Sequence, residues 1–169
     1  FEFTFEPGDF GFDIALEREW RRCARTRNPL SLLFLDADCF KQYNDNYGHL
    51  KGDQCLQNIA QALTNSLQRG GDLAARYGGE EFAVILSNAD SGSAANVAEL
   101  VRRAIEDLRI PHEHSSAAKF VTASIGCATL IPRGEQSFEF LISLADSALY
   151  RAKSAGRNRV VVADTSAIT

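Results

Sequence analysis

Two adjacent acids, Glu80 and Glu81, stand directly after the pair Gly78-Gly79 in this sequence. Neighbouring carboxylates on a tight turn repel each other and gain nothing from packing, so a cation is their natural partner. A surface turn would carry the same residues, since short motifs often match by chance. A third acid, Asp36, ends an apolar run at residues 30–35. Because Mg²⁺ binds one or two carboxylates together with substrate phosphates, these acids are candidates for a phosphate-handling metal site.

These acids can meet only if the elements that carry them are neighbours in one sheet. The continuous apolar run 30–35 is typical of a central strand buried on both faces. Strand-like residues 73–77 and 82–86 flank the two glycines, which predicts a β-hairpin with the glycines at positive φ or in close backbone approach at its tip. If the first and third of these strands pair, Asp36 and Glu80 converge on one edge of the sheet.

The rest of the chain predicts helices around these strands, with apolar residues spaced three and four apart. We expect helices over residues 13–27, 40–46, a long segment ending near 67, a segment capped by 90–93, and 136–154, and strands over 120–130 and 160–163. Asp38 is expected to cap the short helix that follows it. The order of elements predicts an α/β (α+β) domain over residues 12–169, after an N-terminal linker at 1–11.

Three cations are placed where they can meet phosphate. Lys41 lies in the turn after the first strand, where backbone N–H groups and a cationic side chain can bind an anion. Lys153 and Arg157 stand four residues apart at the end of the last long helix, on one face. Compensation of the helix dipole is an alternative explanation for this pair.

The bulk composition limits the class of protein. A chain of 169 residues fits one domain, and its net charge of −4 argues against a nucleic-acid polymer as partner. No apolar run approaches the roughly 20 residues that span a bilayer, and no signal-peptide pattern opens the chain. We therefore expect a cytoplasmic segment without membrane contact, with reduced thiols at its scattered cysteines. Because the chain starts at Phe1 without methionine, we expect it to be part of a longer protein.

The stretch around the glycines resembles the signature of the GGDEF family, the diguanylate cyclases, in the variant GGEEF. Other segments resemble the family in the same order and cover roughly residues 12 to 163: FLDADCFK (34–41), YNDNYGH (43–49), GD (52–53), RGGD (69–72), SIG (124–126) and ADSALYRAKSAGRN (145–158). The resemblance implies a palm-like nucleotidyl cyclase fold, with a central, mostly antiparallel five-stranded sheet surrounded by helices.

The resemblance also implies roles for the acids. Asp36, the backbone carbonyl of Ala37 and Glu80 are the implied ligands of two Mg²⁺ (or Mn²⁺) ions per active site, with Glu81 as a further ligand. Glu80 is also the implied general base for the 3′-hydroxyl, and Lys41 is the second implied catalytic residue.

The implied contacts to GTP surround these acids. The substrate-binding set is Phe40, Lys41, Asn44, Asp53, Gly78, Gly79, Lys153 and Arg157. Asn44 and Asp53 match the guanine ligands of the family, because a carboxylate accepts from N1–H and N2–H₂ and an amide can both donate and accept. Such a pocket should reject adenine.

A second nucleotide site is implied at Arg69-Gly-Gly-Asp72, which resembles the RxxD inhibitory site that binds the product in regulated family members. Arg102 or Arg103 would supply a further arginine of that site. An ion pair on a surface turn is the alternative explanation.

The sequence therefore predicts a diguanylate cyclase that condenses two GTP molecules into cyclic di-GMP and two pyrophosphates, works as a homodimer, is inhibited by its product and is controlled by an upstream sensory domain. Alternatives from other classes are a catalytically silent receptor for cyclic di-GMP, a nucleotidyl cyclase with another base preference, and a purely structural dimerisation module.

Overall fold

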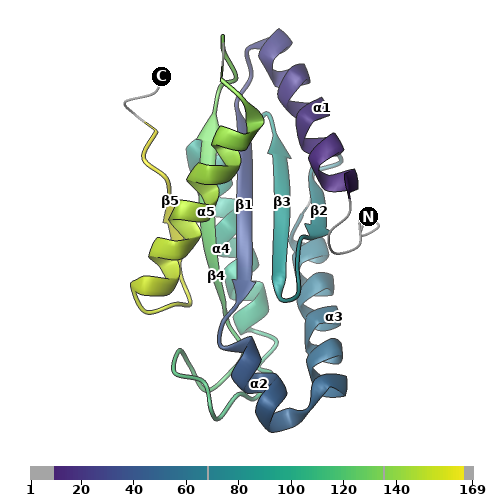
Figure 1. Ribbon diagram of the computed structural model, residues 1–169, viewed down its shortest axis with the longest axis vertical. Helices are drawn as coiled ribbons and strands as arrows, with labels where there is room; N and C mark the ends of the chain where they lie inside the picture. Colours follow the sequence, from purple (N-terminus) through teal and green to yellow (C-terminus); the bar gives the residue numbers. More distant parts are fainter. Residues whose placement is uncertain (1–9, 68, 135, 166–169) are drawn as a thin grey trace.

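The computed structural model describes residues 10–67, 69–134 and 136–165. Its strands form one central sheet, and its helices lie around that sheet (Figure 1). In chain order the elements are α1 (Phe10–Thr26), β1 (Leu30–Ala37), α2 (Phe40–Tyr47), α3 (His49–Ser66), β2 (Leu73–Arg76), β3 (Glu81–Ser87), α4 (Ser91–Glu106), β4 (Ala123–Leu130), α5 (Phe138–Ser154) and β5 (Val160–Val162). Residues 1–9 of the expected linker lie outside the described residues, and α1 begins at Phe10.

The sheet has five strands in the order β2-β3-β1-β4-β5. Neighbouring strands are antiparallel except β4 and β5, which are parallel. β1 is central, and the apolar run 30–35 is buried throughout, as its composition predicted. The α+β architecture with a mostly antiparallel five-stranded sheet is therefore confirmed.

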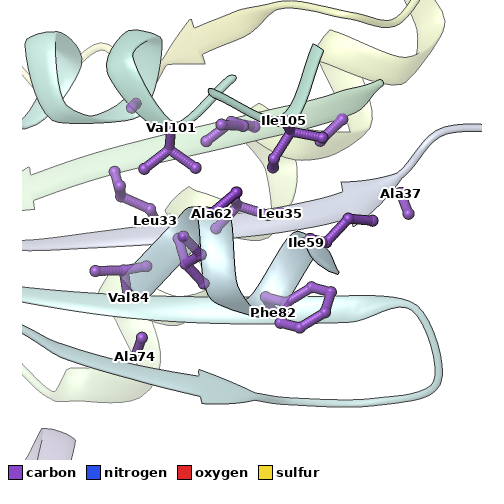
Figure 2. Close-up of a cluster of buried hydrophobic side chains, with 14 of the residues drawn as sticks. Leu33, Leu35, Ala37, Ile59, Ala62, Ala74, Phe82, Val84, Val101 and Ile105 are labelled. Carbon is purple, nitrogen blue, oxygen red and sulfur yellow. The ribbon is translucent and has the colours of Figure 1, made fainter. Parts of the chain in front are cut away.

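Each face of the sheet is covered by helices, and β1 contributes alternate residues to the two resulting cores. Leu33 and Leu35 point to the face covered by α3 and α4, where they join Ile59, Val101 and Ile105 (Figure 2). The even-numbered residues of β1 point to the opposite face. There, Leu30, Leu32 and Phe34 pack with side chains from α1 and α5. By this alternation Asp36 belongs to the α5 face.

Close packing of α5 on β4 depends on Gly126. A Cβ at this position would overlap the Ala145 carbonyl oxygen and the backbone of Leu149. Only a glycine permits this approach. The contact sets the distance of the whole of α5 from the sheet, including the last turn, which carries Lys153.

The starts of β4 and α5 are among the boundaries that differ from the prediction. The strand expected from residue 120 begins at Ala123, and Phe120 forms only an isolated bridge with Pro111. The helix expected from residue 136 begins at Phe138. In the described ranges, no helix combines the length and the apolar character needed to cross a bilayer.

Candidate active site

The strand pairing brings the predicted acids together. In the antiparallel register of β1 and β3, Asp36 lies opposite Glu81. One residue beyond, the Ala37 N–H donates to the Glu80 carbonyl at 3.2 Å. The end of β1, the β2–β3 turn and α2 lie at the same end of the molecule (Figure 1). The sheet edge thus collects the acids of two strands that are 44 residues apart in the sequence.

The turn that carries Gly78 and Gly79 is held by hydrogen bonds at its tip. Tyr77 and Gly78 donate their N–H groups to the Glu81 carbonyl at 2.8 and 3.2 Å. Arg76 donates from Nε and Nη2 to the Gly79 carbonyl at 2.9 and 2.6 Å. The expected positive φ is absent from both glycines. Close approach is present at Gly78, where a Cβ would lie 2.9 Å from Glu81 Oε2.

Asp36 is a buried carboxylate with one cationic partner. Lys153 Nζ lies 2.6 Å from Asp36 Oδ2, and the Asp36 side chain is only 13% exposed. Burial raises the pKa of Asp36 to about 6, which the Lys153 hydrogen bond and charge oppose and which Glu80 and Glu81 reinforce. The ionised carboxylate is therefore costly in the free fold, and further positive charge would favour it.

The donors at this edge fit Mg²⁺ by their chemistry. They are carboxylate and carbonyl oxygens, which a hard divalent cation prefers. Within the described residues no group of three His, Cys, Asp or Glu side chains is close enough to enclose an ion. Mg²⁺ needs no such cage, because it retains waters and shares substrate phosphates. Asp36, the Ala37 carbonyl, Glu80 and Glu81 are the residues that would hold it.

Asp38 has a different role from the one predicted. Its carboxylate accepts hydrogen bonds from Thr122 Oγ1 at 2.7 Å, Ser124 Oγ at 2.6 Å and the Asn158 N–H at 3.0 Å. The N-cap position of α2 is Cys39, in the left-handed region at φ 58°. The predicted helix cap is thus wrong, and Asp38 instead joins the end of β1 to β4 and to the turn after α5.

The predicted phosphate-binding cations surround the same edge. Lys41 is exposed in the first turn of α2, and Lys153 reaches Asp36 from the last turn of α5. Arg157 is half-buried in the following turn. Although burial acts the other way, hydrogen bonds from Ser116 and Ser115 and the charge of Arg157 hold the pKa of the Cys39 thiol below its ordinary value.

The predicted guanine ligands lie on α2 and α3. Asn44 Oδ1 is buried and has no hydrogen-bond partner, and a Cβ on Gly52 would overlap it. Asp53, the next residue on α3, is exposed. An unpaired buried acceptor beside a free carboxylate fits a ligand with adjacent N–H donors. Phe40 is 7% exposed and stacks on Tyr43, so its side chain belongs to the core.

The two residues of the predicted inhibitory site differ in their exposure to solvent. Arg69 is exposed, whereas Asp72 is 2% exposed and its Oδ1 has no hydrogen-bond partner. Burial raises the pKa of Asp72, and the nearby Arg69 opposes this effect. Of the two candidate additional arginines, Arg102 is 13% exposed at its side chain and Arg103 is 68% exposed.

Sequence reasoning missed Arg76 and Asn158. Arg76 is the last residue of β2, directly before the turn. Its long side chain can bond a carbonyl at the tip of the hairpin, as it does at Gly79, and its place in the sequence indicated this. The signal for Asn158 was weaker. Asparagine tolerates the left-handed conformation, and Asn158 adopts it in the turn just after a helix.

Comparison with known proteins agrees with this geometry. The sequence profile described as "Diguanylate cyclase, GGDEF domain" matches residues 9–159. The chain belongs to the GGDEF family. It is 49% identical over 133 residues to diguanylate cyclase VdcA of Vibrio cholerae, which covers 78% of this chain and 38% of VdcA.

Two solved GGDEF structures are similar to the domain. The coiled coil and GGDEF domain of DgcB from Caulobacter crescentus in complex with c-di-GMP has a TM-score of 0.80 at 31% identity, covering 90% of this chain and 78% of that one. The active GGEEF domain of a diguanylate cyclase from Vibrio cholerae has a TM-score of 0.77 at 30% identity, covering 89% and 93%. The GGDEF domain described here therefore spans about two fifths of VdcA and nearly all of an isolated GGEEF domain.

Proposed function

We propose that this GGDEF domain is a diguanylate cyclase that joins two GTP molecules into cyclic di-GMP and releases two pyrophosphates. The observation that carries the proposal is the meeting of Asp36 with Glu80 and Glu81 at one sheet edge, beside Lys153. The 49% identity to a named diguanylate cyclase supports it.

Asp36, the Ala37 carbonyl, Glu80 and Glu81 would hold two Mg²⁺ or Mn²⁺ ions. When bound, the ions supply charge neutralisation at the attacking hydroxyl and at the phosphates. Glu80 takes the proton of the 3′-hydroxyl as general base. Its neighbour Glu81 is fixed through its carbonyl, which accepts two hydrogen bonds from the turn. The hydrogen bonds of the turn thus fix the backbone positions from which the Glu80 and Glu81 side chains extend.

Lys153 changes partner during binding. In the free domain it neutralises Asp36 at 2.6 Å. In the loaded site the Lys153 ammonium group would bind a phosphate oxygen, together with Lys41 and Arg157, because Asp36 would then hold a cation. Gly78 and Gly79 leave the turn open to the phosphates, since the Cβ position of Gly79 has no atom within 4 Å.

Asn44 and Asp53 select guanine. The Asn44 oxygen accepts from the base, and the Asp53 carboxylate accepts from N1–H and N2–H₂. A purine with an acceptor at that edge leaves both groups unpaired, which gives strong discrimination.

Catalysis needs two copies of the domain. One site holds one GTP, so each 3′-hydroxyl must be brought to the α-phosphate bound by the partner, and alignment of the reactants controls the rate. A coiled coil accompanies the GGDEF domain in the DgcB structure, and we assign control of this pairing to an upstream sensory or regulatory domain of the full protein.

Product inhibition is assigned to Arg69, Asp72 and Arg103. Arg103 is the more accessible arginine: its side chain is 68% exposed and pairs with Glu99, whereas Arg102 is 13% exposed and pairs with both Glu99 and Glu106. Since Asp72 is buried, product binding requires its carboxylate to turn outward.

Product formation from GTP and Mg²⁺, measured at increasing protein concentration with and without added cyclic di-GMP, tests the proposal. We expect the rate per domain to rise with concentration and to fall with added product. Glu80→Ala should abolish synthesis with the fold intact, whereas the matched exposed-acid variant Glu17→Ala on α1 should retain it. Full activity of Glu80→Ala would refute the assignment, and binding of cyclic di-GMP without synthesis by the wild type would make the domain a receptor.

A further inference from the structure

The turn after α5 has an unusual backbone. Gly156, Arg157 and Asn158 follow one another at positive φ values of 112°, 64° and 45°. Residues other than glycine are disfavoured in this region, and they persist there when surrounding contacts hold them. Strained backbone of this kind is common at functional sites, where neighbouring contacts hold it in place.

Asn158 makes the contacts that hold the turn. Its N–H donates to Asp38 Oδ2 at 3.0 Å. Its Oδ1 accepts from Arg102 Nη1 at 2.6 Å, and its Nδ2 donates to Glu106 Oε1 at 3.0 Å. Both polar atoms of the side chain are therefore bonded to α4, and the backbone is bonded to the segment that follows β1.

The partners of Asn158 are themselves fixed. Arg102 forms ion pairs with Glu99 and Glu106, each at 2.9 Å, and its side chain is 13% exposed. Asp38 is 2% exposed and has two further hydroxyl donors. Hydrogen bonds between charged and polar groups that are already placed are the strongest means of orienting a turn.

Arg157, the neighbour of Asn158, is the residue that this arrangement orients. In the described part of the chain its guanidinium has no hydrogen-bonded or carboxylate partner of its own. The hydrogen bond from the Asn158 N–H to Asp38, two residues after Asp36, holds the adjoining backbone of Arg157 beside the end of β1. The position of Arg157 is thus set through the backbone of the turn.

We propose that Asn158 is a positioning residue for nucleotide binding: by fastening the strained turn to Arg102 and Glu106 of α4, it aims Arg157 at the triphosphate. The inference rests on the proposed GTP site. A consequence is that α4, which contributes no predicted substrate ligand, influences triphosphate affinity through Arg102.

The test uses Asn158→Gly in the 169-residue chain. Glycine retains the N–H to Asp38 and tolerates positive φ, so the substitution removes only the bonds to α4. Arg102→Ala removes one of these two bonds from the other side, leaves the bond to Glu106, and serves with a smaller expected loss if the first variant does not fold. Arg21→Ala is the matched control, because it breaks a helical ion pair with Glu17, at 2.6 Å on α1, away from the site.

Affinity is measured by calorimetry for inorganic tripolyphosphate with Mg²⁺, and by NMR titration for guanosine. We expect Asn158→Gly to bind tripolyphosphate about tenfold more weakly, the scale of one charge-assisted hydrogen bond. Guanosine affinity should stay within about twofold of wild type. Equal weakening for both ligands would show general loosening and overturn the proposal.

A double-mutant cycle with Arg157→Ala gives the decisive comparison. If Asn158 acts through Arg157, Asn158→Gly should add little in the Arg157→Ala background. Additive losses would overturn the inference. Failure of the wild type to bind GTP would instead refute the proposed function, whereas GTP binding that is unchanged in Asn158→Gly would refute only the role of Asn158.

Discussion

Asp36→Asn should stabilise the free domain at neutral pH while it removes synthesis. Burial raises the pKa of this carboxyl from 3.8 to about 6, although Lys153 lowers it, and Glu80 and Glu81 add to the rise. The ionised side chain is therefore disfavoured in the fold relative to the unfolded chain. An amide of the same shape avoids that cost but supplies a weaker metal ligand.

The magnitude follows from the difference between the two pKa values. The change from 3.8 to about 6 corresponds to about 3 kcal/mol in the free energy of unfolding at neutral pH. Below 3.8 the carboxyl is protonated in both states and the cost is absent. The cost develops as the pH rises through the window between the two values, so wild-type stability falls across this window relative to the variant.

Urea unfolding of both proteins at about pH 4 and about pH 7.5 measures this effect. All other titrating groups are shared, so the difference between the two unfolding free energies isolates Asp36. We expect Asp36→Asn to be more stable by up to about 3 kcal/mol at the higher pH and by less than about 1 kcal/mol at the lower. Glu17→Gln, in an exposed ion pair with Arg21, should change stability by less than about 1 kcal/mol at both. A variant that is less stable than wild type at pH 7.5, or equally shifted at both pH values, would refute the reasoning.

Two glycine substitutions separate packing from recognition. Gly126→Ala should destabilise the fold by about 3 kcal/mol or more in urea unfolding, because its methyl group meets the backbone of α5. Gly92→Ala on α4 is the control and should be near neutral, because a methyl group there meets only Asp90 Oδ1, at an ordinary contact distance of 3.7 Å. Gly52→Ala should leave the free energy of unfolding nearly unchanged, because its methyl group meets the movable amide of Asn44. The same substitution should weaken GTP binding about tenfold, because it displaces a guanine contact. Tripolyphosphate affinity should stay at the wild-type level in Gly52→Ala, and a parallel loss there would contradict the assignment of Asn44 to the base.

The sheet was predictable because its signals are local. The apolar run 30–35 indicates burial on both faces, and the two glycines between strand-like segments indicate a hairpin. Pairing of β1 with β3 was the condition for the predicted site, and the structure meets it. The start of β4 was not predictable from composition. Phe120 and the residues after it are typical of a strand, but Phe120 bridges Pro111 and the Val121 N–H donates to the Ile110 carbonyl. This segment therefore pairs with the connection after α4 and joins the sheet only at Ala123.

The site was predictable as far as strand register determines it. Asp36 and Glu80 were expected to converge, and the register brings them to one edge. The bonds of Asp38 to Asn158 depend instead on a turn 120 residues later, which no local pattern connects to β1. Similarly, the burial of Asp72 depends on the packing around the α3–β2 connection and not on the RxxD spacing.

Asp36 and Asp38 show how a functional acid can be distinguished from a structural one. Both are shielded from solvent at the end of the same strand. Asp38 has three donors that belong to the protein and needs no ligand. Among the described residues Asp36 has only Lys153 as a hydrogen-bonded partner, and its neighbours Glu80 and Glu81 make its ionisation harder. A fold selected for stability alone would satisfy Asp36 as it satisfies Asp38. Lys153 balances Asp36, and the further negative charge of Glu80 and Glu81 beside it fits the cation that we propose is supplied with the nucleotide.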